Sequence, residues 1–196
     1  MNTPNKLTIL RIIATPVFMA TMLINFPYHY LVSLVLFIGA SLTDMIDGKM
    51  ARKYNLVTDF GKFLDPLADK MLTTAAFLGF ISMFAGTKYC WHLTAITFIV
   101  LFREFLVSSL RLVVLSSGGK VIAANIWGKS KTVSQMVSII LALAAYAVKE
   151  IFALSAGIMD IVNLVIVIVF WASAILCIIS GATYLLGGKE YIDPSK

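Results

Sequence analysis

Four aspartates stand at helical spacings within a strongly apolar part of the sequence. Asp44 and Asp47 are three residues apart, and Asp65 and Asp69 are four residues apart. At about 100° per residue, each pair shares one face of a helix, so two facing helices would present four carboxylates to one small volume. An ionised carboxylate in or near hydrocarbon costs at least about 2.5–3.5 kcal/mol, so such a cluster needs compensating cations. The spacing therefore predicts a divalent metal site.

The expected metal and its chemistry follow from the donor atoms. Carboxylate oxygens favour hard cations such as Mg²⁺ or Mn²⁺, whose coordination is usually completed by phosphate oxygens of a substrate. Two such ions about 3.5–4 Å apart can hold the entering and leaving oxygens of a phosphoryl displacement. The pattern favours metal-assisted transfer of a phosphorylated group.

Small and basic residues accompany the aspartates, and each has two interpretations. Gly48 and Ala51 lie on the helical face of the first two aspartates, where the absence of bulk would let a large ligand approach the backbone. The alternative is close packing of helices, which is common in membranes. Gly61 either serves the ligand site or forms a turn. Arg52 either binds phosphate or extends to the lipid headgroups.

The elements that must position these residues are long apolar segments. Of the 196 residues, 60% are hydrophobic, well above the roughly 45–50% of soluble domains, and the mean hydropathy is +0.92. The sequence predicts one integral membrane domain over residues 1–196. The net charge of +6 comes from basic residues scattered between apolar segments. This scatter argues against a nucleic-acid interface and favours an anionic membrane surface or a phosphorylated substrate.

Six segments are long enough to cross a bilayer at about 20 apolar residues each. An even number places both termini on one side. That side is predicted to be the cytoplasm, because only Lys88 and Lys149 of the basic residues then lie outside. The aspartates fall at the cytoplasmic ends of the second and third segments. We expect an all-α multi-pass protein of the cell membrane, with spans at residues 7–25, 30–52, 63–85, 91–115, 132–148 and 161–186.

A second group of charged residues lies in and after the fourth predicted span. Arg103, Glu104 and Arg111 stand at apolar depth, and Lys129 and Lys131 precede the fifth span. The two arginines are separated by about 80° around a helix, so they could converge loosely on one cavity. Charge inside a membrane is a functional candidate, and guanidinium groups suit a phosphate dianion. The alternative is that Arg103 pairs with Glu104 or the aspartates and only holds the bundle together.

The remaining reactive side chains have simpler explanations. Cys90 and Cys177 lie in or beside apolar stretches, so neither a disulfide framework nor a cysteine-based zinc site is indicated. His29 and His92 lie at predicted outer span ends, away from the aspartates, and are assigned to the membrane interface. The aromatic residues expected at the interface are Trp91, Tyr30, Tyr89, Tyr184 and Tyr191.

The aspartates belong to a longer pattern, D-x2-D-G-x2-A-R-x8-G-x3-D-x3-D, which resembles the signature of the CDP-alcohol phosphotransferases. The resemblance implies a six-helix membrane fold, usually homodimeric, with a polar cavity facing the cytoplasm. It also implies two divalent ions held by Asp44, Asp47 and Asp65, with Asp69 contributing. The pattern is filled at every position, by Asp44, Asp47, Gly48, Ala51, Arg52, Gly61, Asp65 and Asp69.

The resemblance also implies roles for these residues. Asp69 would be the general base that deprotonates an acceptor hydroxyl, whose oxygen attacks the β-phosphorus of a CDP-linked lipid and releases CMP. Gly48, Ala51 and Gly61 would accommodate the cytidine, and Arg52 would lie near its diphosphate. A carboxylate beside a dication is a weaker base, so a plain metal ligand is the alternative for Asp69. The same metal also acidifies a coordinated alcohol, so a modest base can suffice.

Flanking motifs narrow the resemblance to the bacterial phosphatidylglycerophosphate synthases. These motifs are Pro4-Asn5-Lys6-Leu7-Thr8 with Arg11, Arg103-Glu104-Phe105 to Leu110-Arg111, and Gly128-Lys129-Ser130-Lys131-Thr132. The substrates would then be CDP-diacylglycerol and glycerol 3-phosphate. Phosphatidylglycerol as acceptor, giving cardiolipin, is the nearest rival. Residues expected to bind the acceptor phosphate are Arg103, Arg111, Lys129, Lys131 and Thr8, although Thr8 could instead cap the first helix.

A metal or proton transporter is a hypothesis of a different class. It predicts carboxylates distributed through the depth of the bilayer and an opening on the outer side. Here the four aspartates cluster near one face, and no acidic residue lies between Asp69 and the outer end of the third span. A membrane scaffold without catalytic activity would give such costly charges no purpose. The sequence therefore favours an enzyme.

Overall fold

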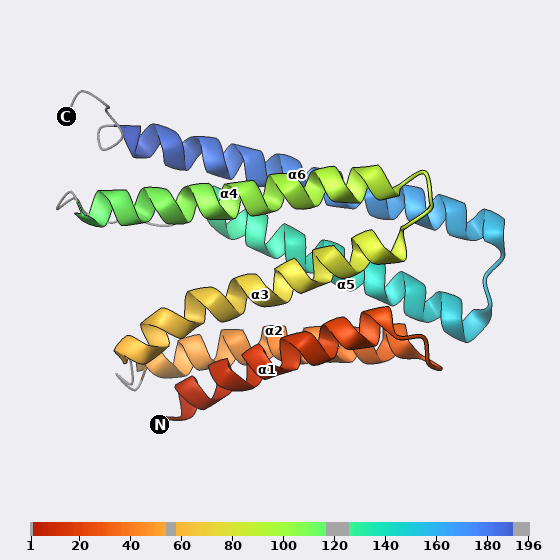
Figure 1. The fold of residues 1–196 in the computed structure, drawn as a ribbon, viewed down its shortest axis with the longest axis horizontal. Helices are drawn as coiled ribbons and strands as arrows, with labels where there is room; N and C mark the ends of the chain where they lie inside the picture. The colour runs from red at the N-terminus through yellow and green to blue at the C-terminus, as the bar shows by residue number, and fades with distance from the viewer. Residues whose placement is uncertain (1, 54–57, 117–125, 190–196) are drawn as a thin grey trace.

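The computed structural model describes residues 2–53, 58–116 and 126–189, without the side chains of residues 3, 45–53, 59 and 62. Within these ranges every regular element is a helix and no strand is present, so the predicted all-α class is confirmed for the described chain (Figure 1). Each predicted span coincides with one helix. The helices are α1 (Thr3–Leu23), α2 (His29–Lys53), α3 (Asp59–Met83), α4 (Cys90–Ser116), α5 (Ile126–Phe152) and α6 (Ala156–Gly187).

Three of the described helices are long and apolar enough to cross a membrane. They are α1 over Pro4–Leu23, α5 and α6, while α2 contributes a shorter apolar part, His29–Asp44. Charged residues interrupt the apolar run in α3 and α4. Large apolar side chains such as Phe98 and Phe105 are nonetheless exposed on α4, as expected for contact with lipid. The apolar helices indicate a membrane protein, and the count of six spans stays a prediction.

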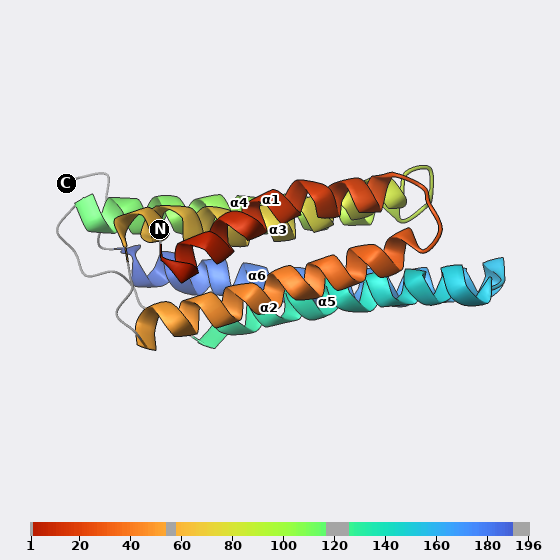
Figure 2. The same cartoon turned by 90° about the horizontal axis from the view of Figure 1, so that it is seen from below.

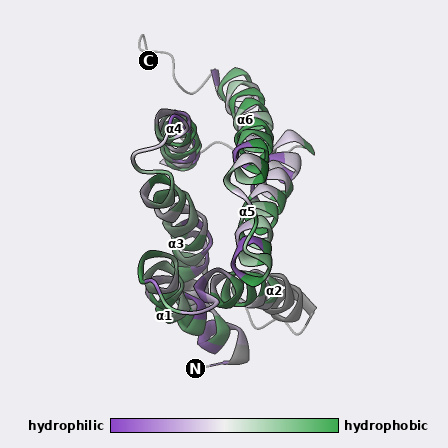
Figure 3. Cartoon of the chain, turned by 90° about the vertical axis from the view of Figure 1, so that its right-hand side faces the viewer, coloured by the Kyte–Doolittle hydropathy of each residue, from purple (hydrophilic) through white to green (hydrophobic). Residues whose placement is uncertain are grey.

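The six helices form two layers of three and alternate in direction along the chain. One layer holds α1, α3 and α4, and the other holds α2, α5 and α6 (Figures 2 and 3). The connections α1–α2, α3–α4 and α5–α6 all lie at one end of the bundle. The start of α3 and the last turns of α2, α4 and α6 lie at the opposite end (Figure 1). This topology brings the charged sequence motifs to the same end.

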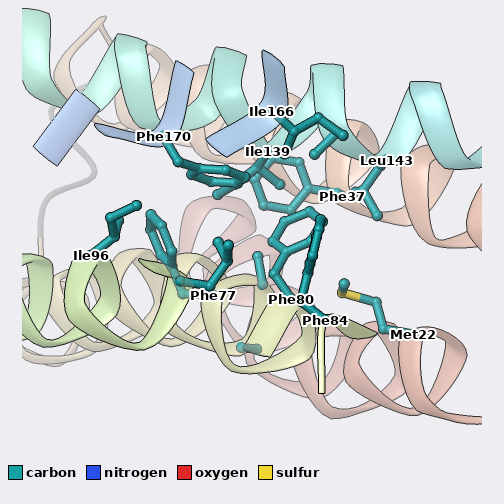
Figure 4. Close-up of a cluster of buried hydrophobic side chains, with 14 of the residues drawn as sticks. Met22, Phe37, Phe77, Phe80, Phe84, Ile96, Ile139, Leu143, Ile166 and Phe170 are labelled. Atoms are coloured by element: carbon teal, nitrogen blue, oxygen red, sulfur yellow. The ribbon is translucent and has the colours of Figure 1, made fainter. Parts of the chain in front are cut away.

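Aromatic packing joins the two layers in the middle of the bundle. The ring of Phe170 on α6 lies 5.5 Å from that of Phe77 and 5.2 Å from that of Phe80, both on α3 (Figure 4). Phe18 of α1 similarly contacts Phe37 of α2 at 5.6 Å. Such pairs add about 0.5–1.5 kcal/mol each to the free energy gained from burial alone. These rings belong to a buried apolar cluster that packs the two layers together.

A buried polar contact closes the end of the bundle remote from the aspartates. His29 Nε2 lies 3.3 Å from Glu150 Oε1, and His29 Nδ1 lies 3.1 Å from the carbonyl oxygen of Thr21. The backbone N–H of Tyr30 also donates to Glu150, at 3.1 Å. These contacts join α1, α2 and α5. His29 is thus buried and connects three helices, and it lies at the other end of α2 from Asp44, as predicted.

The packing of α1 on α3 depends on Gly79, and its replacement tests the fold. A Cβ atom at Gly79 would lie 2.6 Å from Met22 Sδ, whereas one at Gly39 of α2 would meet nothing within 4 Å. We expect Gly79→Val to destabilise the protein by about 1–3 kcal/mol through overpacking. Thermal unfolding in detergent measures the effect, with Gly39→Val as the matched control. Equal shifts for the two variants would contradict this packing.

Candidate functional site

The start of α3 is fixed by a contact with α1. Thr58 is the N-cap of α3, and its hydroxyl accepts a hydrogen bond of 3.0 Å from the backbone N–H of Gly61. The side-chain amide of Asn5 on α1 donates to the same hydroxyl at 2.9 Å. A Cβ atom at Gly61 would lie 2.9 Å from Asn5 Oδ1. Gly61 therefore allows α1 to approach α3 closely at the base of the aspartate motif.

One face of α1 contacts both aspartate-bearing helices. The hydroxyl of Thr8 donates to Asp65 Oδ1 of α3 at 2.9 Å. Three residues later on the same face, Arg11 donates from Nη1 to Asp44 Oδ1 of α2. Thr8 and Arg11 are only 1% and 2% exposed, so the α1 side of both contacts is buried. The first helix thereby sets the position of a carboxylate on each of its neighbours.

The aspartates keep accessible oxygens at this end of the bundle. Asp65 and Asp69 are exposed and lie one turn apart on α3, and the side chain of Asp44 is 37% exposed. Asp69 is within electrostatic reach of Asp44 and of Arg11. Three of the four predicted ligands thus lie at this end of the bundle, on α2 and α3.

The side chains of Asp47, Gly48, Ala51 and Arg52 lie outside the described part of the structure, although their backbone belongs to α2. Among the side chains that are described, no three acidic, histidine or cysteine residues lie close enough to hold a metal ion. The chemistry of the donor set, carboxylates with accessible oxygens, fits a hard divalent cation. Asp47 would complete that set from α2.

A second polar cluster lies between α4, α5 and α6, and Glu104 is at its centre. Glu104 Oε1 accepts hydrogen bonds from Arg103 Nη1, at 3.0 Å, and from Lys131 Nζ of α5. Arg103 Nη2 donates to Ser180 Oγ of α6 at 2.6 Å. The pairing of Arg103 with Glu104, left open by the sequence, is therefore present. Sequence reasoning gave Glu104 no role of its own, although a lone acid between arginines in an apolar span was the available signal.

The two polar clusters are neighbours through α3. Lys70 follows Asp69 and donates from Nζ to Ser108 Oγ of α4. Asp69 itself is within electrostatic reach of Lys131 and Glu104. The predicted metal ligands and the predicted phosphate-binding residues thus share one end of the bundle. Lys129 is exposed close to the first turn of α5, at that same end.

The last turns of α6 carry a residue whose predicted location was wrong. Tyr184 was expected at the membrane interface, but it is 2% exposed. Its hydroxyl accepts a hydrogen bond of 3.0 Å from Arg111 Nη2. Tyr89 is also buried and donates to Asp160 Oδ1 at 3.0 Å. The spacing of Ser180 and Tyr184, one turn apart on a very apolar helix, could have indicated an inward polar face. Tyr191 lies outside the described residues.

Comparison with known proteins identifies relatives of this chain. The chain is 39% identical over 195 residues to the CDP-diacylglycerol–glycerol-3-phosphate 3-phosphatidyltransferase of Rickettsia bellii, covering 97% of each chain. It is 43% identical over 150 residues to the protein of the same name from Bacillus subtilis, covering 70% of this chain and 74% of that protein. A family model described as CDP-alcohol phosphatidyltransferase matches residues 1–179. The chain therefore belongs to the CDP-alcohol phosphatidyltransferase family.

Proposed function

We propose that this protein transfers the phosphatidyl group of CDP-diacylglycerol to glycerol 3-phosphate, forming phosphatidylglycerol phosphate and releasing CMP. The observation that carries the proposal is the contact of Lys70, the residue after Asp69 on α3, with Ser108 of α4, which bonds to the backbone of Glu104 and so brings the Glu104–Lys131 pair beside the aspartate-bearing helix. A phosphorylated acceptor needs cations beside the reacting centre, and this cluster supplies them. The names of the relatives from Rickettsia bellii and Bacillus subtilis support the same reaction.

In this reaction the aspartates would hold two Mg²⁺ or Mn²⁺ ions, with Asp44, Asp47, Asp65 and Asp69 as ligands. Such ions neutralise the diphosphate and acidify an alcohol. Thr8 holds one oxygen of Asp65, and Arg11 holds one oxygen of Asp44, so each keeps the other oxygen for a ligand. These contacts orient the carboxylates before substrate binds, as outer hydrogen bonds do in metal sites.

Asp69 is assigned the proton transfer. Its exposed carboxylate accepts the proton of the primary hydroxyl of glycerol 3-phosphate. The hydroxyl oxygen then forms a bond with the β-phosphorus, and the bond from that phosphorus to the CMP oxygen breaks. The CDP moiety is assigned to Gly48, Ala51, Arg52 and Gly61.

The acceptor phosphate is assigned to Arg111, Lys129 and Lys131, with Arg103 and Thr8 nearby. Arg111 and Lys129 are exposed, so their charges are accessible. Arg103 has both terminal nitrogens bonded to Glu104 and Ser180, and Thr8 is bonded to Asp65. These contacts suit a positioning role for Arg103 and Thr8 better than direct contact with the phosphate.

The membrane arrangement belongs to the same proposal. Six spans with both termini and the active site in the cytoplasm agree with the alternating helices and the apolar outer surface. Some of that apolar surface would serve a homodimer. In this orientation the site faces the compartment that supplies soluble glycerol 3-phosphate.

Release of CMP by the purified protein tests the reaction. CDP-diacylglycerol and Mg²⁺ or Mn²⁺ are supplied with glycerol 3-phosphate, phosphatidylglycerol, serine or inositol phosphate in turn. Turnover with glycerol 3-phosphate alone, lost in Asp65→Asn, is the expected result. Turnover with phosphatidylglycerol instead would favour the cardiolipin-forming alternative. No CMP with any acceptor from folded protein would refute the enzyme and favour the transporter.

The two roles of Asp69 are separated by Asp69→Asn. We expect kcat to fall by at least about a hundredfold, the contribution of a positioned general base, with Mn²⁺ binding retained. Electron paramagnetic resonance of bound Mn²⁺ measures the second quantity. Asp65→Asn is the comparison, because it should lose both metal and turnover. Loss of Mn²⁺ in Asp69→Asn as well would make Asp69 a ligand rather than the base.

The contact of Thr8 with Asp65 is tested by Thr8→Val, which keeps the shape and removes the hydroxyl. We expect Mn²⁺ affinity to weaken by about tenfold, as for other outer contacts of metal sites. Thr15→Val is the matched control, since Thr15 is also buried on α1 but donates only within its own helix, to Arg11 O. Unchanged Mn²⁺ affinity with a raised KM for glycerol 3-phosphate would instead place Thr8 at the acceptor.

A further inference from the structure

Three residues on one face of α6 contact both arginines of α4. Ser180 and Gly181 touch Arg103, and Tyr184 contacts Arg103 and Arg111. They lie within about one turn of α6, so they face α4 together. None of the three was assigned to the site from the sequence alone.

We infer that Ser180, Gly181 and Tyr184 form a platform that fixes the arginines of α4 for the acceptor phosphate, and that Tyr184 is a specificity-determining positioning residue acting through Arg111. The inference rests on the proposed function. It adds a role for α6, a helix outside the aspartate motif.

Arg103 is immobilised on this platform. Its Nη2 donates to Ser180 Oγ at 2.6 Å, and Ser180 is fully buried. A Cβ atom at Gly181 would lie 3.1 Å from Arg103 Cγ, so the glycine leaves room for the arginine stem. Arg103 Nε is buried and has no hydrogen-bond partner among the described residues. Packing and two terminal contacts therefore hold this guanidinium, and one of those contacts is its ion pair with Glu104.

Tyr184 is held just as firmly. Its ring packs with Val107, Leu110 and Val114 of α4, and the residue is 2% exposed. The guanidinium carbons of Arg103 and Arg111 lie 5.6 and 5.4 Å from the ring centre, within the range of cation–π attraction. The ring therefore joins the two arginines, and packing against α4 keeps it in one orientation.

The hydroxyl of Tyr184 gives the platform its effect on binding. It accepts from one terminal nitrogen of Arg111, whose side chain is otherwise exposed. An exposed arginine loses rotamer freedom when it binds a ligand, and a group fixed beforehand avoids much of that cost. Glu104 is the ion-pair partner of Arg103 and Lys131, whereas Arg111 has no carboxylate partner among the described residues, so its guanidinium is the one on the platform that is open to an anion. Together with the lysines assigned to the same anion, this oriented guanidinium suits a small phosphomonoester.

Tyr184→Phe removes only the hydroxyl and keeps the packed ring. We expect the KM for glycerol 3-phosphate to rise about fivefold, in line with the loss of one hydrogen bond. The KM for CDP-diacylglycerol and kcat should stay within about twofold, because the aspartate site is untouched. Tyr89→Phe is the matched control: it removes the hydroxyl of another buried tyrosine, bonded to Asp160 at the far end of the bundle.

The same change in an Arg111→Lys background tests whether Tyr184 acts through Arg111. We expect no further rise in the KM for glycerol 3-phosphate, since coupled residues are non-additive. Full additivity, an unchanged KM in Tyr184→Phe, or an equal change in Tyr89→Phe would each overturn the platform. If the unaltered protein turns over glycerol 3-phosphate, each of those results overturns the platform and leaves the proposed function standing. Absence of that turnover in the unaltered protein would overturn the proposed function and, with it, the role of the platform.

Discussion

The pairing of charge inside an apolar bundle is the constraint on which this structure depends. An unpaired ion in hydrocarbon is costly, so each buried charge must have a partner or a ligand. Arg11 meets this need at Asp44, and Glu104 meets it for Arg103 and Lys131. The partners come from different helices in the pairs Arg11–Asp44 and Lys131–Glu104. The same contacts that neutralise charge therefore fix the arrangement of the helices at the polar end.

Because of this constraint, the first and the last helix of the chain, α1 and α6, have a similar function. The first helix holds Asp65 and Asp44 through Thr8 and Arg11, and α6 holds Arg103 through Ser180. Neither helix carries the aspartate motif. Both supply neutral or cationic partners that restrict a charged side chain on a neighbouring helix. Restricting those side chains in advance lowers the entropy lost when substrate binds.

Local pattern was enough to predict the helices and the aspartate faces. The spacing of Asp65 and Asp69 places them one turn apart in any helix, and the apolar segments reach bilayer length without tertiary information. Contacts between helices were not available from the sequence. That Thr8 bonds Asp65 depends on how α1 approaches α3, which Gly61 and Asn5 determine in three dimensions. Tyr184 was assigned to the interface because an amphipathic ring near a span end usually lies there. Its inward rotation toward Arg111 is a property of the packing of α6 on α4.

The aspartate motif and the side chains around it have different tasks in the proposed reaction. This difference explains why the sequence predicts the type of reaction more readily than the identity of the acceptor. In the proposed reaction the aspartates handle the diphosphate and the attacking oxygen, which are common to every reaction of this type. Such shared chemistry requires fixed donors at fixed spacing, and a one-dimensional pattern records that spacing well. The acceptor is distinguished by groups remote from the transferred phosphorus, so in the proposed reaction its recognition would depend on side chains such as Arg111 and Lys131. These side chains come from α4 and α5, and partners on α6 and α4 hold them. Specificity for the acceptor would therefore depend on contacts between helices, which the aspartate signature does not include.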